Sequence, residues 1–310
     1  MSPGNRAGNG VAALTCALLI LCLGVCLPGE PARPTFTLAF GGDVMLGRGV
    51  ARALNGDWPA AFAGIAERLA DADLALANLE SLLTNEPQLA DGYDLRAMPA
   101  AVGALYSAGF DAVSLANNHA LDAGKAGLAE TLATLESAGI AGVTSHAAGR
   151  LVSRIPPHPS LRYQLFAFDD STIPLDVEAA ARQVTGVASP AELVIISIHW
   201  GGEYQAAPSP RQRSIAEVLA RAGADLVIGH GPHVLQPVER TGETLVAYSL
   251  GNLLFDQLYP DDSRWGAILR ITLTTQGRMS FELLPTVTER GRVRLANPGE
   301  ARAILARLSP

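Results

Sequence analysis

Six metal-competent side chains share one local setting in this sequence, at or just past a short apolar run and beside glycine or asparagine. They are Asp43, Glu80, His119, His199, His230 and His233. Neutral imidazole and carboxylate together suit zinc, manganese or iron. An apolar run that ends in such a residue is typical of a strand followed by a tight turn that carries a metal ligand. The pattern recurs in five separate stretches, which packing alone explains poorly.

Each of these residues also has a purely structural explanation. Asp43 could cap a following helix, and Glu80 could be an ordinary surface acid. Function is favoured for the histidines, because an imidazole at the end of an apolar run is costly to bury unless it is paired. The pair Asn117-Asn118 before His119 has little packing rationale, and an amide oxygen is a hard metal ligand.

The elements that must position these residues alternate between strand and helix. Strand-like runs lie at 35–40, 73–78, 111–117, 192–199 and 225–230, and segments with helical spacing, such as 60–70, separate them. That order implies a mainly parallel sheet. Ligands of such sheets bind at the carboxyl ends of the strands. We therefore expect one rim that carries Asp43, Glu80, Asn118, His119, His199 and His230, with His233 in the adjoining turn.

The pattern of predicted elements changes beyond Pro237. Runs at 243–250, 265–275 and 279–289 read as strands without intervening helices. They predict a second, antiparallel-leaning sheet packed on the first. We expect a single domain over residues 35–310, with surface loops at 146–160 and 256–264.

Composition limits the classes of partner. The net charge is -7, the pI is about 5.4 and no Lys/Arg run occurs. Nucleic acid is excluded as a partner, because phosphate backbones require a basic footprint. All three cysteines lie before residue 27, so the body of the protein has neither a disulfide framework nor a thiolate metal site.

The N-terminal segment, residues 1–34, predicts export. Residues 11–27 form a near-continuous apolar run, which Arg6 precedes and a Pro- and Gly-rich linker follows. Its length lies between that of a signal-peptide core and that of a short spanning helix. Either the segment is cleaved, which gives a periplasmic or secreted protein, or it anchors the chain at the extracytoplasmic face of the cell membrane. A lipid anchor at Cys26 and a buried core helix are the alternatives.

The combined set supports one or two divalent ions that activate water and clamp a phosphoryl group. His119 would protonate the leaving group or hold the phosphate, and Asp122 would orient it as the carboxylate of a carboxylate–histidine pair.

Six motifs carry a family resemblance, and in order they span about residues 36–256. They are GGDVMLGR, NLES, LANNHALDAG, HWGGEY, GADLVIGHGPHVLQPVE and AYSLGNLLFD. Together they resemble the capsule-synthesis protein A (CapA) family of poly-γ-glutamate biosynthesis, whose fold is similar to that of the calcineurin-like metallophosphoesterases. The resemblance implies a four-layer α/β/β/α sandwich. It places metal ligands at Asp43, Glu80, Asn118, His199, His230 and His233, and the Asn-His pair of that superfamily at Asn118-His119.

Two departures from the phosphoesterase pattern stand out. That pattern has a histidine two residues after the first aspartate, where this chain has Met45, and a His-x-His pair where this chain has His-x-x-His. One metal position is therefore expected to be weaker. Arg48, Glu203 and Asn252 are candidate substrate-binding residues near the same rim.

Three functions fit these observations. The first is an exported, membrane-tethered component of poly-γ-glutamate synthesis that acts with capsule-synthesis membrane proteins on an anionic polymer. The second is a stand-alone phosphoesterase of the periplasm or cell surface that needs manganese, iron or zinc. The third is a binding module that keeps the fold without catalysis, for which Met45 is the argument.

Overall fold

The computed structural model describes residues 35–89, 91–145, 162–187, 192–274 and 278–308. They belong to one compact unit, Pro34–Pro310. The predicted export segment at 1–34 and the loop predicted at 146–160 lie outside the described residues. Within the described ranges, no helix has both the length and the apolar character to cross a bilayer.

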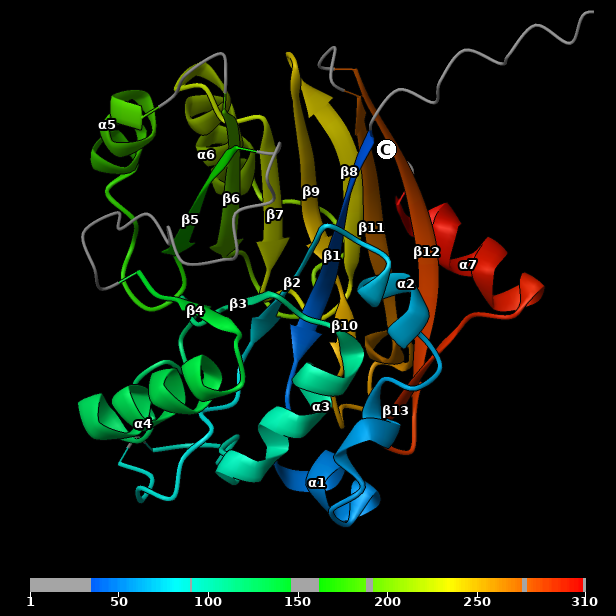
Figure 1. The fold of residues 1–310 in the computed structure, drawn as a ribbon. Coiled ribbons are helices and arrows are strands. Elements are labelled where there is room, and N and C mark those ends of the chain that lie inside the picture. The colour runs from blue at the N-terminus through cyan, green and yellow to red at the C-terminus, as the bar shows by residue number, and fades with distance from the viewer. Residues whose placement is uncertain (1–34, 90, 146–161, 188–191, 275–277, 309–310) are drawn as a thin grey trace, which may run out of the picture. The chain divides into compact units, whose positions relative to one another are not determined.

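The first sheet joins a parallel half to an antiparallel half through its central strand (Figure 1). The parallel strands are β1 (Thr35–Val44), β2 (Leu74–Leu79), β3 (Ala112–Ser114) and β4 (Ala141–Val143). The antiparallel strands are β11 (Trp265–Thr274), β12 (Met279–Glu289) and β13 (Arg292–Leu295). The order is β13-β12-β11-β1-β2-β3-β4, and the short β10 (Asn252–Leu254) pairs with the end of β1.

The second sheet has the order β5-β6-β7-β9-β8. Its parallel members are β5 (Tyr163–Asp169), β6 (Leu193–His199), β7 (Leu226–His230) and β9 (Thr244–Leu250). β8 (Leu235–Thr241) adds the one antiparallel edge among the described strands of this sheet. The central strands β6, β7 and β9 are apolar along most of their length, because both of their faces are covered.

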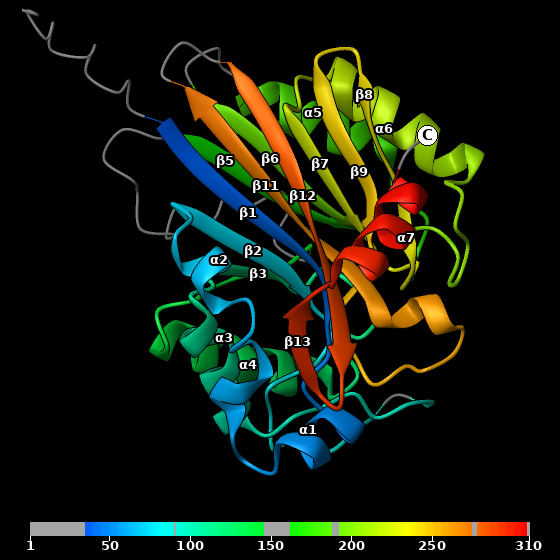
Figure 2. The same ribbon diagram turned by 90° about the vertical axis from the view of Figure 1, so that its right-hand side faces the viewer.

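Helices cover the outer face of each sheet (Figure 2). The first sheet carries α1 (Arg48–Leu54), α2 (Ala66–Ala70), α3 (Val102–Ala108) and α4 (Gly124–Ser137), with the 3₁₀ turns η1 (Trp58–Ala61) and η2 (Pro99–Ala101). The second carries α5 (Val177–Val187) and α6 (Pro210–Arg221). A further 3₁₀ turn, η3 (Asp261–Arg264), precedes β11, and α7 (Pro298–Leu308) packs beside β8 and β12.

Three apolar cores separate these layers. Phe40, Leu76, Ile195 and Ile228 belong to the core between the two sheets. The other two cores lie between each sheet and its helices. The result is the four-layer α/β/β/α sandwich, so the predicted fold class is confirmed.

Two sequence predictions differ from this fold. The strands beyond Pro237 do not form a sheet of their own: β8 and β9 complete the sheet of β5–β7, and β11 to β13 extend the sheet of β1. Alternation with helices cannot reveal which sheet an antiparallel strand will join.

The helix predicted at 60–70 is broken, and only Ala66–Ala70 is α-helical after η1. Gly64 lies between them, and it pairs with Arg294 of β13 instead of continuing a helix.

Candidate metal centre

The carboxyl ends of four parallel strands, two from each sheet, bring five ionisable side chains together. Asp43 lies at the end of β1 and Glu80 follows β2, while His199 and His230 are the last residues of β6 and β7. His233 lies in the turn after β7. We call Asp43, Glu80, His199, His230 and His233 the metal cluster. None of its residues is more than 5% exposed.

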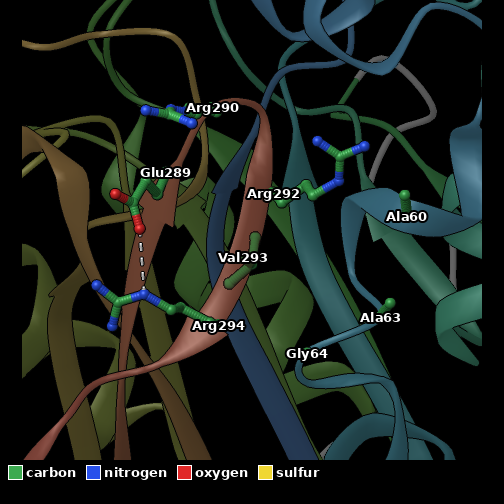
Figure 3. A pocket seen from close by; sticks show the side chains of 8 residues that line it. All are labelled: Ala60, Ala63, Gly64, Glu289, Arg290, Arg292, Val293 and Arg294. Atoms are coloured by element: carbon green, nitrogen blue, oxygen red, sulfur yellow. Dashed lines mark hydrogen bonds and ion pairs between the residues drawn. The ribbon is translucent and has the colours of Figure 1, made fainter.

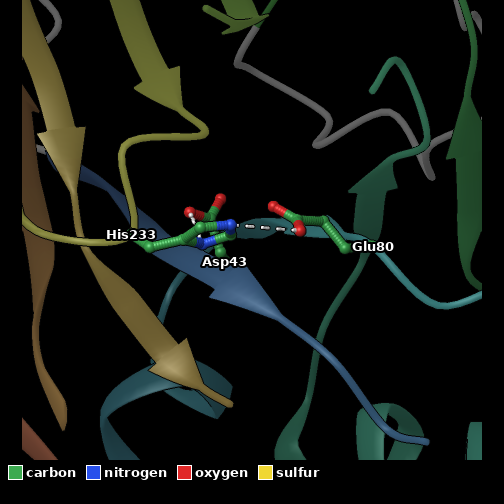
Figure 4. A group of neighbouring side chains, drawn as sticks. All are labelled: Asp43, Glu80 and His233. Carbon is green, nitrogen blue, oxygen red and sulfur yellow. Dashed lines mark ion pairs between the residues drawn. The ribbon is translucent and has the colours of Figure 1, made fainter. Parts of the chain in front are cut away.

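Asp43, Glu80 and His233 form the centre of this cluster (Figure 4). Each offers one ligand atom, and these atoms all lie within 4.8 Å of one another. Nδ1 of His233 lies 3.2 Å from Oδ2 of Asp43, and its Nε2 lies 3.7 Å from Oε2 of Glu80. The imidazole therefore stands between the two carboxylates.

The other two histidines flank this centre. Nδ1 of His230 lies 3.5 Å from Oδ1 of Asp43, and Nε2 of His199 lies 3.3 Å from Oε1 of Glu80. The backbone N–H of Trp200 donates to the carbonyl of His230 over 2.9 Å, which ties the ends of β6 and β7 together. Each carboxylate of one sheet thus faces an imidazole of the other.

Two glycines allow this close approach. Gly231 has φ +104°, and a Cβ there would lie 2.9 Å from Cε1 of His199. Its N–H points at Oδ2 of Asp43 over 3.3 Å. Gly42 lies against the carbonyl of Gly251, which a Cβ would approach to 1.9 Å. A side chain at either position would displace the cluster.

One buried amide, that of Asn78, holds both carboxylates, and a second, that of Asn117, holds Asn78; neither role was predicted from the sequence. Nδ2 of Asn78 donates to Asp43 over 2.9 Å and to Glu80 over 3.0 Å. Nδ2 of Asn117 donates to Oδ1 of Asn78 over 3.0 Å and to the carbonyl of Leu79 over 2.9 Å. One signal could have found Asn78: it lies two residues before Glu80 in an extended strand and so shares its face.

The rim beside the cluster holds Asn118, His119 and Asp122, which we call the His119 rim. Asn118 is exposed, and its Nδ2 lies 3.2 Å from Nε2 of His119. Nδ1 of His119 lies 2.8 Å from Oδ2 of Asp122. The backbone N–H of His119 donates to Oδ1 of Asn117, which connects the rim to the buried amides. The side chain of Asn118 is outside this buried network, whereas that of Asn117 is inside it.

The candidate substrate-binding residues have different surroundings. Arg48 forms an ion pair of 2.8 Å with Asp256 and lies over the ring of Tyr93. Asn252 is buried, and its Oδ1 lies 3.0 Å from Nδ1 of His233. Glu203 is exposed in the turn after β6. Asn252 therefore supports a cluster imidazole, and Glu203 is open to solvent.

Met45 occupies the position at which the phosphoesterase pattern has a histidine. Its side chain is fully buried in the core between the first sheet and its helices. The sulfur accepts the N–H of Gly47 over 3.0 Å. Because the thioether of Met45 is buried in the core, this position offers the cluster no imidazole.

The electrostatics of the cluster favour a cation between its carboxylates. Burial raises the pKa of Asp43, but the neighbouring imidazoles of His230 and His233 outweigh it and hold that pKa well below its ordinary value. Burial lowers the pKa of His233, but Glu80 and Asp43 raise it to about 10. The pKa of His199 is likewise raised, since Glu80 overcomes its desolvation. Positive charge here compensates two buried carboxylates, and a divalent ion supplies the same charge.

Spare lone pairs provide the test of whether a metal fits. Oε2 of Glu80 and both ring nitrogens of His230 are buried without a hydrogen-bond partner. Buried polar atoms are almost always satisfied, so such orphans call for a ligand. Carboxylate and imidazole donors match manganese, iron or zinc. The residues present therefore fit a divalent ion.

A hydroxyl and a carboxylate hold the Nδ1 side of His199, opposite the Nε2 that faces Glu80. Nδ1 of His199 lies 3.0 Å from Oγ of Ser171, and that hydroxyl is also 2.5 Å from Oδ1 of Asp169. The hydroxyl donates to the carboxylate, which leaves its oxygen to accept N–H from Nδ1 of His199. In that tautomer Nε2 presents its lone pair to the cluster.

A cavity of about 300 Å³ adjoins the rim. Asn117, Asn118 and Asp169 line its polar side, and Leu121 and Ile173 line its apolar side. Its size suits a small ligand. The cavity therefore offers space for part of a substrate next to the His119 rim.

Comparisons with known proteins find a family and relatives that match most of the chain. A family model described as "Bacterial capsule synthesis protein PGA_cap" matches residues 37–257. The capsule biosynthesis protein CapA of Bacillus anthracis is 29% identical over 82% of this chain and 68% of its own length. The PGA biosynthesis protein CapA of Bacillus subtilis (strain 168) is 29% identical over 80% of this chain and 70% of its own length.

One solved structure shares the fold. A crystal structure described as a novel phosphatase from Mycoplasma pneumoniae aligns with a TM-score of 0.54 over 87% of this chain and 97% of that chain. The sequence identity is 12%, so the likeness concerns the fold alone.

Proposed function

This chain belongs to the bacterial capsule synthesis protein PGA_cap family, and on that premise we propose that it acts in poly-γ-glutamate capsule biosynthesis with a divalent ion at the metal cluster. The resemblance seen in the sequence motifs is confirmed by this membership. Both CapA relatives carry capsule or PGA biosynthesis in their names, which supports the same role here.

One observation carries the metal part of the proposal. Asp43, Glu80 and His233 converge from different elements, and their ligand atoms lie within 4.8 Å of one another. His199 and His230 add imidazoles against the same two carboxylates. Two buried carboxylates this close are costly without cations between them. The proposed ligands are therefore these five side chains, and Asn118 remains a candidate sixth.

When bound, a divalent ion would polarise an oxygen of the substrate and lower the pKa of water. The chain's own residues have three tasks. Asn78 fixes the two carboxylates, Ser171 fixes the tautomer of His199, and His119 moves a proton. With Nδ1 held by Asp122, Nε2 of His119 is the atom that can protonate a leaving group.

The proposal includes a place and partners. Residues 1–34 would export the chain and either hold it at the extracytoplasmic face of the membrane or be removed. Retention would bring it next to the membrane proteins that make the polymer. The apolar run and the Pro- and Gly-rich linker in the sequence support this arrangement.

A stand-alone metal-dependent phosphoesterase is the second candidate. The observation that favours it is the His119–Asp122 pair beside the cluster, since capsule binding alone needs no proton donor. A binding module without catalysis is the remaining outcome.

Metal analysis of the full-length protein tests the site. We expect about one to two equivalents of manganese, iron or zinc in the wild type and less than about a tenth of that in His233→Ala. Because His233→Ala could disturb packing, Glu80→Gln serves as a near-isosteric second variant. His119→Ala is the matched control, because it alters a rim imidazole only. A folded wild type without metal, or full metal in both cluster variants, would sink the proposal.

Chromosomal deletion tests the biological role. We expect loss of the capsule polymer, restored by the wild type and not by Glu80→Gln. A normal capsule in the deletion strain, together with manganese-dependent turnover of a phosphodiester by the purified protein, favours the second candidate.

A further inference from the structure

A separate cavity of about 530 Å³ lies between the β12–β13 hairpin and the turn that carries Ala60, Ala63 and Gly64 (Figure 3). It shares no lining residue with the metal cluster. Its other walls come from the hairpin, including Arg290, Arg292 and Arg294. It is therefore a second potential site on the same unit.

Small residues create this space. Gly64 pairs with Arg294, and a Cβ on Gly64 would lie 2.6 Å from the carbonyl oxygen of Val293. The turn consequently lies directly against β13. Ala60 and Ala63 contribute only methyl groups, so the space above them is left to the arginine side chains of the hairpin.

The walls of the cavity are positively charged in an acidic protein. The lining holds three arginines and one acid, Glu289, whereas the whole chain has a net charge of -7. Arg294 neutralises Glu289 over 3.4 Å and forks onto Glu300 at 2.8 and 2.9 Å. Within the described ranges, the exposed Arg290 and Arg292 have neither an ion pair nor a side-chain hydrogen bond. Two guanidinium groups therefore remain for a ligand.

The spacing of these charges indicates the class of ligand. Arg292 and Arg294 lie on one face of β13, about 7 Å apart along the strand. Arg290 lies in the turn, where it has the left-handed φ of 50°, and Figure 3 shows its side chain and that of Arg292 extending to opposite sides of the hairpin. Charges spread along a hairpin suit a chain with repeated anions better than one compact ion. The fork of Arg294 onto Glu300, which lies outside the lining, shows that an arginine of this hairpin binds a carboxylate bidentately.

We propose that this cavity is a binding site for a carboxylate-bearing polymer, held by Arg290 and Arg292. The identification of that polymer as poly-γ-glutamate rests on the proposed function. The site would hold a growing or finished chain on the protein while another segment of the polymer lies at the metal cluster.

Fluorescence anisotropy of the full-length protein with a labelled γ-linked glutamate oligomer tests this site. We expect binding that weakens with added NaCl, and about tenfold weaker binding in R290Q/R292Q, as for two partly exposed charge-assisted pairs. R290K/R292K keeps the charge and should recover most of the loss. R182Q/R221Q, on α5 and α6, removes two exposed arginines elsewhere and should bind as the wild type does.

Several results would overturn the assignment. Equal binding by R290Q/R292Q and the wild type would show that the polymer does not bind in this cavity. An equal loss of binding in R182Q/R221Q would show that overall charge, and not this cavity, causes the effect. Binding of tripolyphosphate without binding of the oligomer would replace the carboxylate polymer by a phosphate ligand. Metal content measured on the same samples keeps the two proposals apart, because it depends on His233 and not on Arg290 or Arg292.

Discussion

The metal cluster and the His119 rim lie side by side but are built in opposite ways. In the cluster, Asp43 is 0% and His230 is 1% exposed, and each carboxylate faces imidazoles from the other sheet. On the rim, the His119 side chain is 21% exposed and is held by the one carboxylate of Asp122. The cluster is suited to hold a charge in place, and the rim is suited to move a proton.

This difference follows from where each group is attached. Cluster residues end strands or occupy the turn after β7, so the fold fixes their positions. Rim residues lie in the loop between β3 and α4, where a substrate can reach them. Mutations in the two regions should therefore affect different measurements.

The largest separation is expected from His119→Ala. If the protein turns over a phosphodiester, as the second candidate function requires, loss of a positioned proton donor should lower that turnover by about 10²–10⁴-fold. Metal content should stay at the wild-type level, because no cluster ligand changes. Steady-state kinetics and elemental analysis of the same preparation provide the two readouts. If His119→Ala loses the metal as His233→Ala is expected to do, the distinction between cluster and rim fails.

Ser171→Ala should have a smaller effect. It should appear in metal affinity and not in turnover. Without the hydroxyl, Nδ1 of His199 loses its acceptor and the tautomer is no longer fixed. We expect metal affinity to fall by about 10–100-fold, as for other partners of ligand histidines. Titration with Mn²⁺ against a competing chelator measures it. Ser137→Ala on α4 removes a hydroxyl that bonds only its own helix, and an equal loss there would discredit the relay through Ser171.

The smallest effect is expected from Glu300→Gln, because Glu300 belongs neither to the metal cluster nor to the His119 rim. The hydrogen bonds of Arg294, followed by that of the Asn297 N–H, hold the pKa of Glu300 at about 2. An acid with a depressed pKa stabilises the fold above its unfolded pKa and loses that contribution as the pH falls towards 2. Since the pair is partly exposed, we expect less than about 1 kcal/mol at pH 7.

Urea unfolding of Glu300→Gln at pH 7 and pH 3 measures this contribution. The difference from the wild type should shrink at the lower pH, while metal content stays unchanged at pH 7. A difference that grows on acidification would contradict the assigned direction.

The sequence predicted the four-layer fold better than the path of its strands. The strand-end rule placed Asp43, Glu80, His199 and His230 at strand ends, and the structure brings these residues together. It could not distinguish Asn117 from Asn118, because the direction of a side chain after a strand depends on the turn. Asn78 was not singled out, since an asparagine in a strand has no signal apart from the carboxylates it supports. The antiparallel strands were assigned to one sheet because local pattern carries no information on long-range pairing.

The glycine turn that brings His233 between Asp43 and Glu80 has a thermodynamic consequence. The oxygen donors belong to one sheet and the nitrogen donors to the other, so an ion shared by them is a cross-link between the two layers. Whatever binds only the docked sheets shifts the folding equilibrium towards them in proportion to the logarithm of its concentration. For this protein, the supply of the ion would then set the stability of the folded chain as well as what it can do.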